Sequence, residues 1–276
     1  MEIVITICVF LGLGALMGVL LAISAKLFHV PVNERVAAIR ACLPGANCGG
    51  CGYSGCDGAA EAIEKGEAKV TVCSVGGADV ARQIGAVMGV EVGEVVRMRA
   101  QVMCSGTIEA AQKKYVYEGA EDCAQAAAIG GGNKLCPDGC IGLGTCAAHC
   151  PFGAIFIRDG VAVVDHEKCM GCGVCVAHCP KGIIKLIPFD SAHWVGCMSR
   201  DKGKEVRAYC DVGCIACKLC EKGCEAGAIT VGDNVASIDY SKCVDCGNCV
   251  EKCPRGIIWS AGRQSNGEFV IKRTKA

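Results

Sequence analysis

The feature that most constrains this chain is a run of four cysteines with the spacing Cys-x2-Cys-x2-Cys-x3-Cys-Pro. It occurs twice, at residues 169–180 and 243–254. A zinc ion needs a tetrahedron of ligands and is usually held by separate pairs of cysteines. Three cysteines at intervals of three, followed by a fourth before a proline, are instead typical of a loop that ligates an iron–sulfur cluster. We therefore expect 4Fe–4S clusters, with a zinc site or a disulfide as the alternative.

Composition agrees with a metal-rich chain. Of the 276 residues, 26 are cysteines and 38 are glycines, while only 5% are aromatic. A large aromatic core is not expected, so the clusters themselves should act as cores of small, loop-rich modules. The formal net charge is zero, which gives no global indication of a nucleic-acid partner. Cysteines grouped at metal-ligand spacing, in a chain of this length, favour a reducing compartment over a secreted disulfide scaffold.

The N-terminus predicts a single membrane helix over residues 1–28. The 23 residues from Ile3 to Ala25 carry no charge, and as a helix they would be about 34 Å long, enough to span a bilayer. A cleaved signal peptide is the alternative, but the chain lacks a positive start and a clear cleavage site. Basic residues follow the apolar run, so the positive-inside tendency places the rest of the chain on the cytoplasmic side of the inner (plasma) membrane. They are Lys26, His29, Arg35 and Arg40.

A different cysteine spacing occupies residues 31–78, where we expect an N-terminal 4Fe–4S domain. The order is Cys48-x2-Cys51-x4-Cys56-x16-Cys73, with glycines between the first three cysteines. Such glycines let the backbone curl tightly and turn its amides toward sulfur. A zinc site is the alternative here. Cys42 lies outside the spacing and is expected to be a structural thiol. Residues 79–122 contain an amphipathic pattern and are predicted to be a helical connector.

Residues 123–262 are an internal duplication with an offset of 74 residues. The predicted units are a first two-cluster ferredoxin module at 123–188 and a second at 189–262, followed by a basic tail at 263–276. Each module contains two cysteine loops joined by a short hairpin. The expected fold class is therefore α+β: a membrane helix, a small Cys-rich domain and two tandem bacterial-type ferredoxin modules.

Ligands follow from the cross-over rule, by which the fourth cysteine of a loop serves the other cluster. The second module then has two regular sets: Cys214, Cys217, Cys220 and Cys253; and Cys243, Cys246, Cys249 and Cys224. The first module has one regular set: Cys169, Cys172, Cys175 and Cys150.

One loop of the first module departs from the pattern, because Leu143 stands where the duplicate has Cys217. Cys140, Cys146 and Cys179 remain, and Cys136 is the nearest candidate for the fourth ligand. Cys123 or Cys104 could replace it, or the site could hold a three-iron cluster. About five clusters in total leave six cysteines without a role: Cys8, Cys42, Cys104, Cys123, Cys197 and Cys210.

Other chemistry is not indicated. The sequence has neither a dinucleotide-binding glycine signature nor a Walker loop, and no catalytic residue for bond chemistry stands out. His149 and His178 lie inside cysteine loops and are expected to tune a cluster rather than ligate it. Basic residues between the modules are either a solvated surface or a docking patch for an acidic electron donor. They are Lys181, Lys185, Arg200, Lys202, Lys204 and Arg207.

The whole order closely resembles the B subunit of the Rnf complex. The resemblance rests on the apolar helix, the Cys-x2-Cys-x4-Cys-x16-Cys domain, the tandem modules, Gly-Cys-Ile-Gly-Leu-Gly at 139–144 and Asp-Lys-Gly-Lys-Glu-Val-Arg at 201–207. It implies a component of a complex that oxidises reduced ferredoxin, reduces NAD+ and exports sodium ions or protons. Soluble ferredoxin would be the electron donor, and flavins and the nicotinamide site would belong to partner subunits.

The resemblance thus implies an electron relay that is an enzyme only within its complex. Electrons would pass from the C-terminal modules toward the N-terminal cluster. Two alternatives stay open: a polyferredoxin arm of another membrane enzyme, such as a hydrogenase or a formate-oxidising complex, and a non-redox, cysteine-rich metal-binding module.

Overall fold

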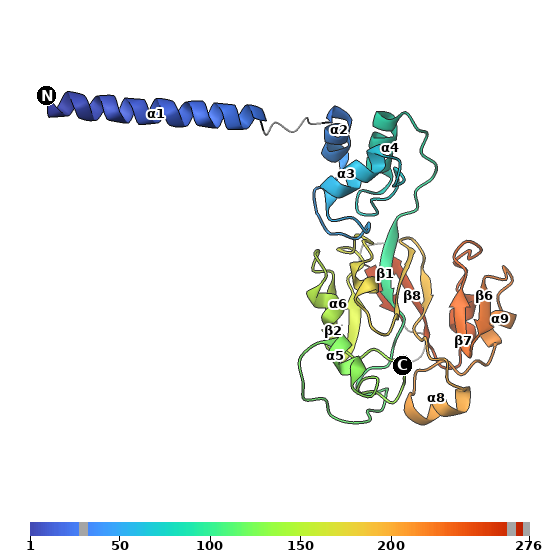
Figure 1. Ribbon diagram of the computed structural model, residues 1–276. Helices are drawn as coiled ribbons and strands as arrows, with labels where there is room; N and C mark the ends of the chain where they lie inside the picture. Colours follow the sequence, from blue (N-terminus) through green and yellow to red (C-terminus); the bar gives the residue numbers. More distant parts are fainter. Residues whose placement is uncertain (28–32, 264–268, 273–276) are drawn as a thin grey trace.

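A computed structural model describes residues 1–27, 33–263 and 269–272 (Figure 1). In it a long helix precedes a small helical domain, and a larger body of short strands, short helices and loops follows. Helices and strands are mixed throughout that body, as expected for the α+β class. His29, Arg273 and Lys275, which were assigned to basic segments, lie outside the described residues.

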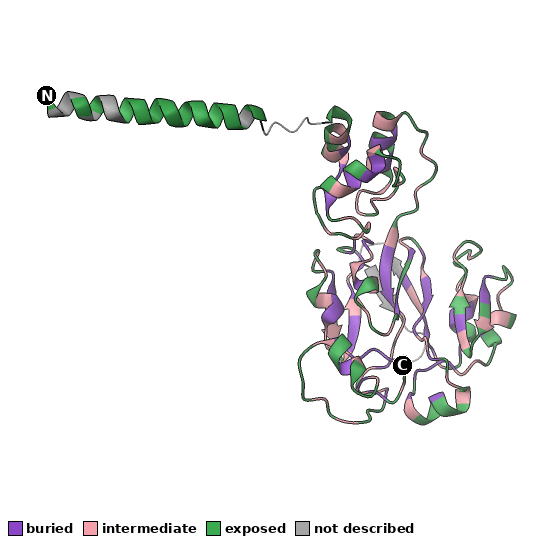
Figure 2. Ribbon diagram, in the orientation of Figure 1, coloured by how far each residue is buried: buried purple, intermediate pink, exposed green. Residues whose placement is uncertain are grey.

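The first element is helix α1 (Glu2–Leu27), which extends away from the rest of the chain (Figure 1). Many of its apolar side chains are exposed, among them Phe10 and Leu21 (Figure 2). Among the residues that the structure describes, no helix is both long enough and apolar enough to cross a membrane. The membrane span predicted for residues 3–25 therefore stays a prediction.

Three helices form the N-terminal domain: α2 (Glu34–Cys42), α3 (Cys56–Glu64) and α4 (Gly77–Met88). They pack around the fully buried side chains of Ile39, Ile63 and Ile84. Asn33 begins α2, because its side-chain oxygen accepts a hydrogen bond from the Arg35 amide at 3.0 Å. Helix α4 was predicted as part of a separate connector. It belongs to this domain instead, because its apolar face is needed to close the core.

The rest of the predicted connector joins the larger body. Strand β1 (Met98–Val102) pairs antiparallel with β4 (Ile184–Pro188), with Ala100 opposite Leu186. Ala111 makes an isolated bridge to Cys210 in the second module. Residues 79–122 are therefore not an independent helical unit, since they add a helix to one domain and a strand to the next.

The two modules share two short helices and a hairpin at equivalent positions, and each adds one helix of its own, α5 or α8. The first holds α5 (Cys123–Ala128), α6 (Thr145–Ala148), α7 (Val174–Ala177) and the hairpin β2 (Ile155–Arg158) with β3 (Val161–Val164). The second holds α8 (Gly203–Tyr209), α9 (Leu219–Lys222), α10 (Asn248–Lys252) and the hairpin β6 (Ile229–Gly232) with β7 (Val235–Ile238). Ile155 pairs with Val164, and Ile229 pairs with Ile238. This equal register in the two hairpins matches the duplication seen in the sequence.

A further sheet closes the second module, in the order β5 (His193–Val195), β8 (Ile258–Arg263) and β9 (Phe269–Lys272). Trp194 and Trp259 stack there with their ring centroids 6.4 Å apart. The segment predicted as a basic tail thus contains a strand, while its residues 264–268 and 273–276 lie outside the described residues. The apolar residues at 269–271 explain why this segment can pair with β8.

Candidate iron–sulfur cluster sites

The four cysteines predicted for the N-terminal domain line one pocket. They are Cys48, Cys51, Cys56 and Cys73. Asn47 shapes the loop, because its side-chain oxygen accepts a 2.8 Å hydrogen bond from the Cys56 amide. Burial raises the pKa of the Cys73 thiol, and the Cys51 and Cys56 thiols raise it further.

Cys42 lies outside this pocket, as predicted for a structural thiol. It is the last residue of α2, and its sulfur lies 3.3 Å from the carbonyl oxygen of Ala38. It packs against the apolar core of the domain.

In the second module the cross-over expected between loops is present in space. One pocket is lined by Cys214, Cys217 and Cys220 of one loop and by Cys253 of the other. Burial, then the thiols of Cys214 and Cys253, raise the pKa of Cys220 to about 11. Four sulfurs from two distant loops therefore face a common space.

The other set of the second module also comes together. Burial, followed by the thiols of Cys243 and Cys246, raises the pKa of Cys249 to about 12. The Cys224 thiol is among the groups that raise the pKa of Cys243, after burial and a nearby Asp245. The Ala228 amide donates to the sulfur of Cys224 at 3.3 Å.

The regular set of the first module repeats this arrangement. Burial and then the thiols of Cys169, Cys172 and Cys150 raise the pKa of Cys175 to about 12. Backbone amides approach two of these sulfurs: Ala154 donates to Cys150 at 3.4 Å and Ala100 to Cys169 at 3.3 Å. The second of these amides comes from β1, which explains why that strand packs against this module.

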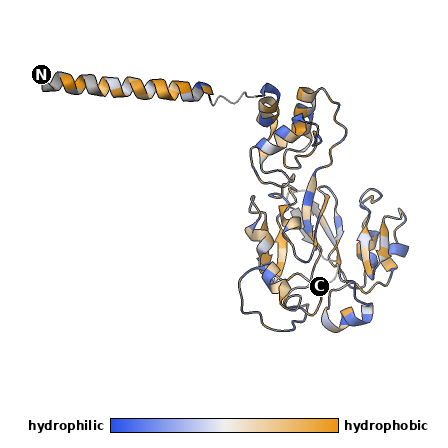
Figure 3. Cartoon of the chain, in the orientation of Figure 1, coloured by the Kyte–Doolittle hydropathy of each residue, from blue (hydrophilic) through white to orange (hydrophobic). Residues whose placement is uncertain are grey.

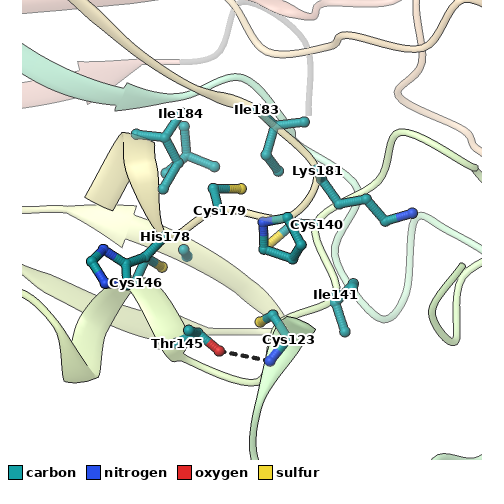
Figure 4. A pocket seen from close by; sticks show the side chains of 13 residues that line it. Cys123, Cys140, Ile141, Thr145, Cys146, His178, Cys179, Lys181, Ile183 and Ile184 are labelled. Atoms are coloured by element: carbon teal, nitrogen blue, oxygen red, sulfur yellow. Dashed lines mark hydrogen bonds between the residues drawn. The ribbon is translucent and has the colours of Figure 1, made fainter. Parts of the chain in front are cut away.

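In the irregular loop of the first module, Cys123 shares a pocket with Cys140, Cys146 and Cys179 (Figure 4). Burial, then the thiols of Cys140, Cys123 and Cys179, raise the pKa of Cys146 to about 12. Cys136, which the sequence favoured for this position, does not line this pocket, so Cys123 replaces it as the candidate fourth ligand.

The reason is the start of helix α5. The Cys123 amide donates a 2.6 Å hydrogen bond to the hydroxyl oxygen of Thr145, and Asp122 caps the helix by accepting from the Gln125 amide (Figure 4). Leu143 packs in the same apolar cluster as Cys123. Cys123 is thus held beside Leu143 at the start of α5, and from there it lines this pocket.

Cys136 lines a different pocket, which lies between the two modules. Cys104, Cys197 and Cys210 line it as well. Sequence reasoning left Cys197 and Cys210 without a role and offered Cys104 only as an alternative ligand of the irregular loop. It did not bring the four cysteines together, because they are far apart along the chain.

The two histidines of the cysteine loops stack on each other. The ring centroids of His149 and His178 are 3.9 Å apart. Their Nδ1 atoms lie 2.8 Å and 2.9 Å from the carbonyl oxygens of Thr145 and Val174. His178 also lines the pocket of Figure 4. Their expected role in tuning a cluster stays a prediction.

The donor sets fit iron–sulfur clusters. Each set consists of four thiols, and backbone amides point at several of the sulfurs, as they do where a protein stabilises a cluster's negative charge. In three of the sets the four cysteines line one common pocket. Within the described part of the chain, no group of three or more His, Cys, Asp or Glu side chains is placed to hold a single metal ion.

Known families and proteins match the same regions. Residues 139–183 and 213–258 each match a 4Fe-4S dicluster domain family, and residues 43–75 match an Fe-S cluster family. The B subunit of the ion-translocating oxidoreductase complex of Methanosarcina acetivorans is 46% identical over 92% of this chain and 96% of its own length. The chain belongs to this family of B subunits.

Two further relatives carry more specific names. The B subunit of the Na(+)-translocating ferredoxin:NAD(+) oxidoreductase complex of Acetobacterium woodii is 47% identical over 89% of this chain and 74% of its own length. The proton-translocating counterpart of Clostridium ljungdahlii is 39% identical over 93% of this chain and 92% of its own length. The resemblance drawn from the sequence is confirmed, and with it the presence of 4Fe–4S clusters.

Proposed function

We propose that this chain accepts electrons from reduced ferredoxin and relays them into an ion-translocating ferredoxin:NAD+ oxidoreductase complex. The names of its relatives support this function. The observation that carries it is the series of neighbouring cysteine sets that runs through the modules into the N-terminal domain. A 4Fe–4S cluster bound at such a site supplies a one-electron carrier.

We propose five sets of four cysteine ligands, one in the N-terminal domain and two in each module. Four are those expected from the sequence, and the fifth is Cys123, Cys140, Cys146 and Cys179. Burial and neighbouring thiols raise the pKa values of Cys146 and Cys175 to about 12. Cluster insertion therefore releases protons, since the ligands must bind as thiolates.

Contacts between neighbouring sets support an uninterrupted path inside each module. Cys175 of one set is among the thiols that raise the pKa of Cys146 in the next, after burial and the thiols of its own set. In the second module the Cys220 thiol is likewise among the groups that raise the pKa of Cys249, after burial and the thiols of its own set. The two sites of each module are therefore close neighbours.

The N-terminal domain joins the first module at Gly50. A Cβ atom at this position would collide with the backbone of Cys172. The Cys48 thiol is also among the groups that raise the pKa of Cys172, after burial. The N-terminal site thus lies directly beside one site of the first module, which supports passage of electrons between them.

We further propose that α1 anchors the chain in the inner (plasma) membrane with the cysteine-rich domains on the cytoplasmic side. The uncharged run of residues 3–25 and the basic residues that follow it support this orientation. The described apolar side chains of α1 are exposed, and hydrophobic residues cover most of its length (Figure 3). Membrane lipid and partner subunits, including those that carry flavin, would then cover this surface.

Docking of ferredoxin is proposed at helix α8. Lys202, Lys204 and Arg207 are exposed on or beside this helix. An acidic donor would be steered there by local charge. Lys181 does not belong to this surface, because its ammonium group donates to the carbonyl oxygens of Gly131 and Pro137, both at 2.6 Å.

The test is anaerobic mixing of the cluster-loaded full chain with reduced ferredoxin, followed by visible absorption and EPR. Reduced-cluster signals should grow in this chain as ferredoxin is oxidised, at a rate that falls with salt. Charge reversal at Lys202, Lys204 and Arg207 should slow the transfer, while reversal at the distant Lys65 should not. A colourless, zinc-loaded chain, or loaded clusters that ferredoxin leaves oxidised, would refute the proposal.

A further inference from the structure

We infer that Cys104, Cys136, Cys197 and Cys210 hold a further 4Fe–4S cluster, at a site formed between the two modules. The four cysteines line one pocket between the modules. They come from four separate segments: the stretch that follows β1, the loop before Cys140, the loop after β5 and the end of α8. The site itself does not depend on the proposed function, whereas its place in the relay does.

The four thiols converge on one another. A Cβ atom at Gly106 would lie 3.6 Å from the sulfur of Cys104 and 3.8 Å from that of Cys210. Both sulfurs therefore lie around the same glycine. Burial raises the pKa of Cys136, Cys197 and Cys210, and the Cys104 thiol raises each of them further. Cys104 is thus near all three other members of the set.

Backbone amides point at the sulfurs, as at the other sites. The Cys197 sulfur accepts from the amides of Ser199 at 3.5 Å and Cys214 at 3.3 Å. The Cys104 sulfur accepts from the Cys140 amide at 3.4 Å. Such N–H···S bonds stabilise the negative charge of a thiolate-ligated cluster.

Two cations fix the walls of the pocket. The buried ammonium group of Lys134 donates to the carbonyl oxygens of Gly106 at 2.5 Å and Gly160 at 3.0 Å. Arg255 donates to the carbonyl oxygen of Cys210 at 2.6 Å. Their positive charge also lies close enough to offset part of the charge of a bound cluster.

The alternative is that these cysteines are small apolar residues in a packed core. Here four buried or half-buried cysteines from four segments line one small pocket, and their thiols are free in the structure, as are the other described cysteines. Apolar packing does not require backbone amides to point at the sulfurs, yet they do so at Cys104 and Cys197.

The site also completes the series of neighbours. The sulfur of Cys104 accepts a hydrogen bond from the amide of Cys140, which is a ligand in the first module. The sulfur of Cys197 accepts one from the amide of Cys214, which is a ligand in the second module. On each side, the amide of a neighbouring ligand thus contacts a sulfur of this set. A cluster here would connect the modules, each of which otherwise holds its own pair.

The test is the iron and acid-labile sulfide content of the full chain, purified anaerobically. Six sites predict about 24 iron and 24 sulfide per chain, and five predict about 20 of each. The variants Cys197→Ala and Cys210→Ala should each lose up to about four iron and four sulfide, the content of one cluster, with the loss of one reduced-cluster spin in EPR. The matched control Cys42→Ala should lose none, because Cys42 lies outside every cysteine pocket described above.

A second measurement uses the chain without substitutions, so it still tests the inference if a variant fails to fold. Alkylation of the loaded chain, read by mass spectrometry, should leave Cys104, Cys136, Cys197 and Cys210 unmodified until iron is chelated, and then label them as one set. Unchanged iron in both variants, one zinc per chain, or prompt labelling of these thiols would overturn the inference. Ferredoxin-driven reduction is measured separately, so its failure would count against the proposed function and not against this site.

Discussion

The exchange of Leu143 for a cysteine offers a direct test of how the irregular loop is completed. In the duplicate the same position is Cys217, and the backbone around the two positions is alike. Gly142 and Gly144 have φ angles of 84° and 84°, and the residues that flank Cys217 have φ angles of 52° and 58°. All four lie in the left-handed region, so a cysteine at 143 would project from the loop as Cys217 does.

We expect Cys123→Ala to convert this site to a three-iron cluster or to empty it. Iron content should fall by about one to four per chain, because a 4Fe–4S cluster with three thiolates loses its unsupported iron first. The double variant Cys123→Ala/Leu143→Cys should restore the full content. The lost packing of the half-buried Leu143 costs about 1–2 kcal/mol of stability, which leaves the fold intact.

The assay is iron and sulfide analysis together with EPR of the oxidised chain, in which a three-iron cluster gives a signal and a 4Fe–4S cluster does not. Cys123→Ala/Leu143→Ala is the matched control, since it removes the same side chains and supplies no thiol. Restoration by alanine, or a three-iron signal in Cys136→Ala that Leu143→Cys removes, would refute the assignment of Cys123.

Three further variants test the contacts around the sites. Gly50→Ala should weaken the docking of the N-terminal domain by about 1–3 kcal/mol, seen as a lower midpoint of urea unfolding and weaker magnetic coupling in EPR, because its Cβ meets the backbone of Cys172. Thr145→Val should cost about 1 kcal/mol and Thr145→Ser should not, since only a hydroxyl can accept from the first amide of α5. Burial and the neighbouring Arg99 lower the pKa of His166 to about 4. The unfolded chain therefore binds a proton below about pH 6.5 that the folded chain rejects, so stability should fall by about 3 kcal/mol between about pH 6.5 and 4, and less in His166→Gln.

Much of the candidate chemistry could be predicted because it is local. The spacing within each loop fixes three sulfurs around one point, and the duplication predicts which distant cysteine supplies the fourth. Cys253 therefore lies beside Cys214 and Cys220, as the cross-over rule requires. The equal register of the two hairpins follows from the same repeat. In these cases the sequence pattern alone predicts which residues lie together.

Cys123 and Cys136 show where such reasoning fails. Cys136 is closer along the chain to Cys140, and proximity favoured it. The deciding contacts are those of Thr145 and Asp122, which place the start of α5 against the loop. Asp122 before an alanine-rich stretch is a helix-start signal, but it does not say which surface the helix covers. That depends on tertiary packing.

The predicted connector at residues 79–122 also shows that tertiary partners could not be predicted from the sequence. Its amphipathic pattern predicted α4 correctly, but not the partner of that helix. The pairing of β1 with β4 joins segments that are far apart along the chain, and Ala100 then directs its amide at Cys169. Pairing partners at such separation are fixed by the whole fold and not by a local pattern.

The site between the modules differs in kind from the others. Each of the five remaining sets lies within one domain or module, so a fragment could in principle form it. The set of Cys104, Cys136, Cys197 and Cys210 draws on the connector and both modules, and it exists only when they are docked. The free energy of cluster binding at this site therefore adds to the docking of the modules, as metal binding adds to folding in small metal-dependent domains. Duplication alone would produce two separate pairs of clusters, whereas a shared site makes the two modules one electron path.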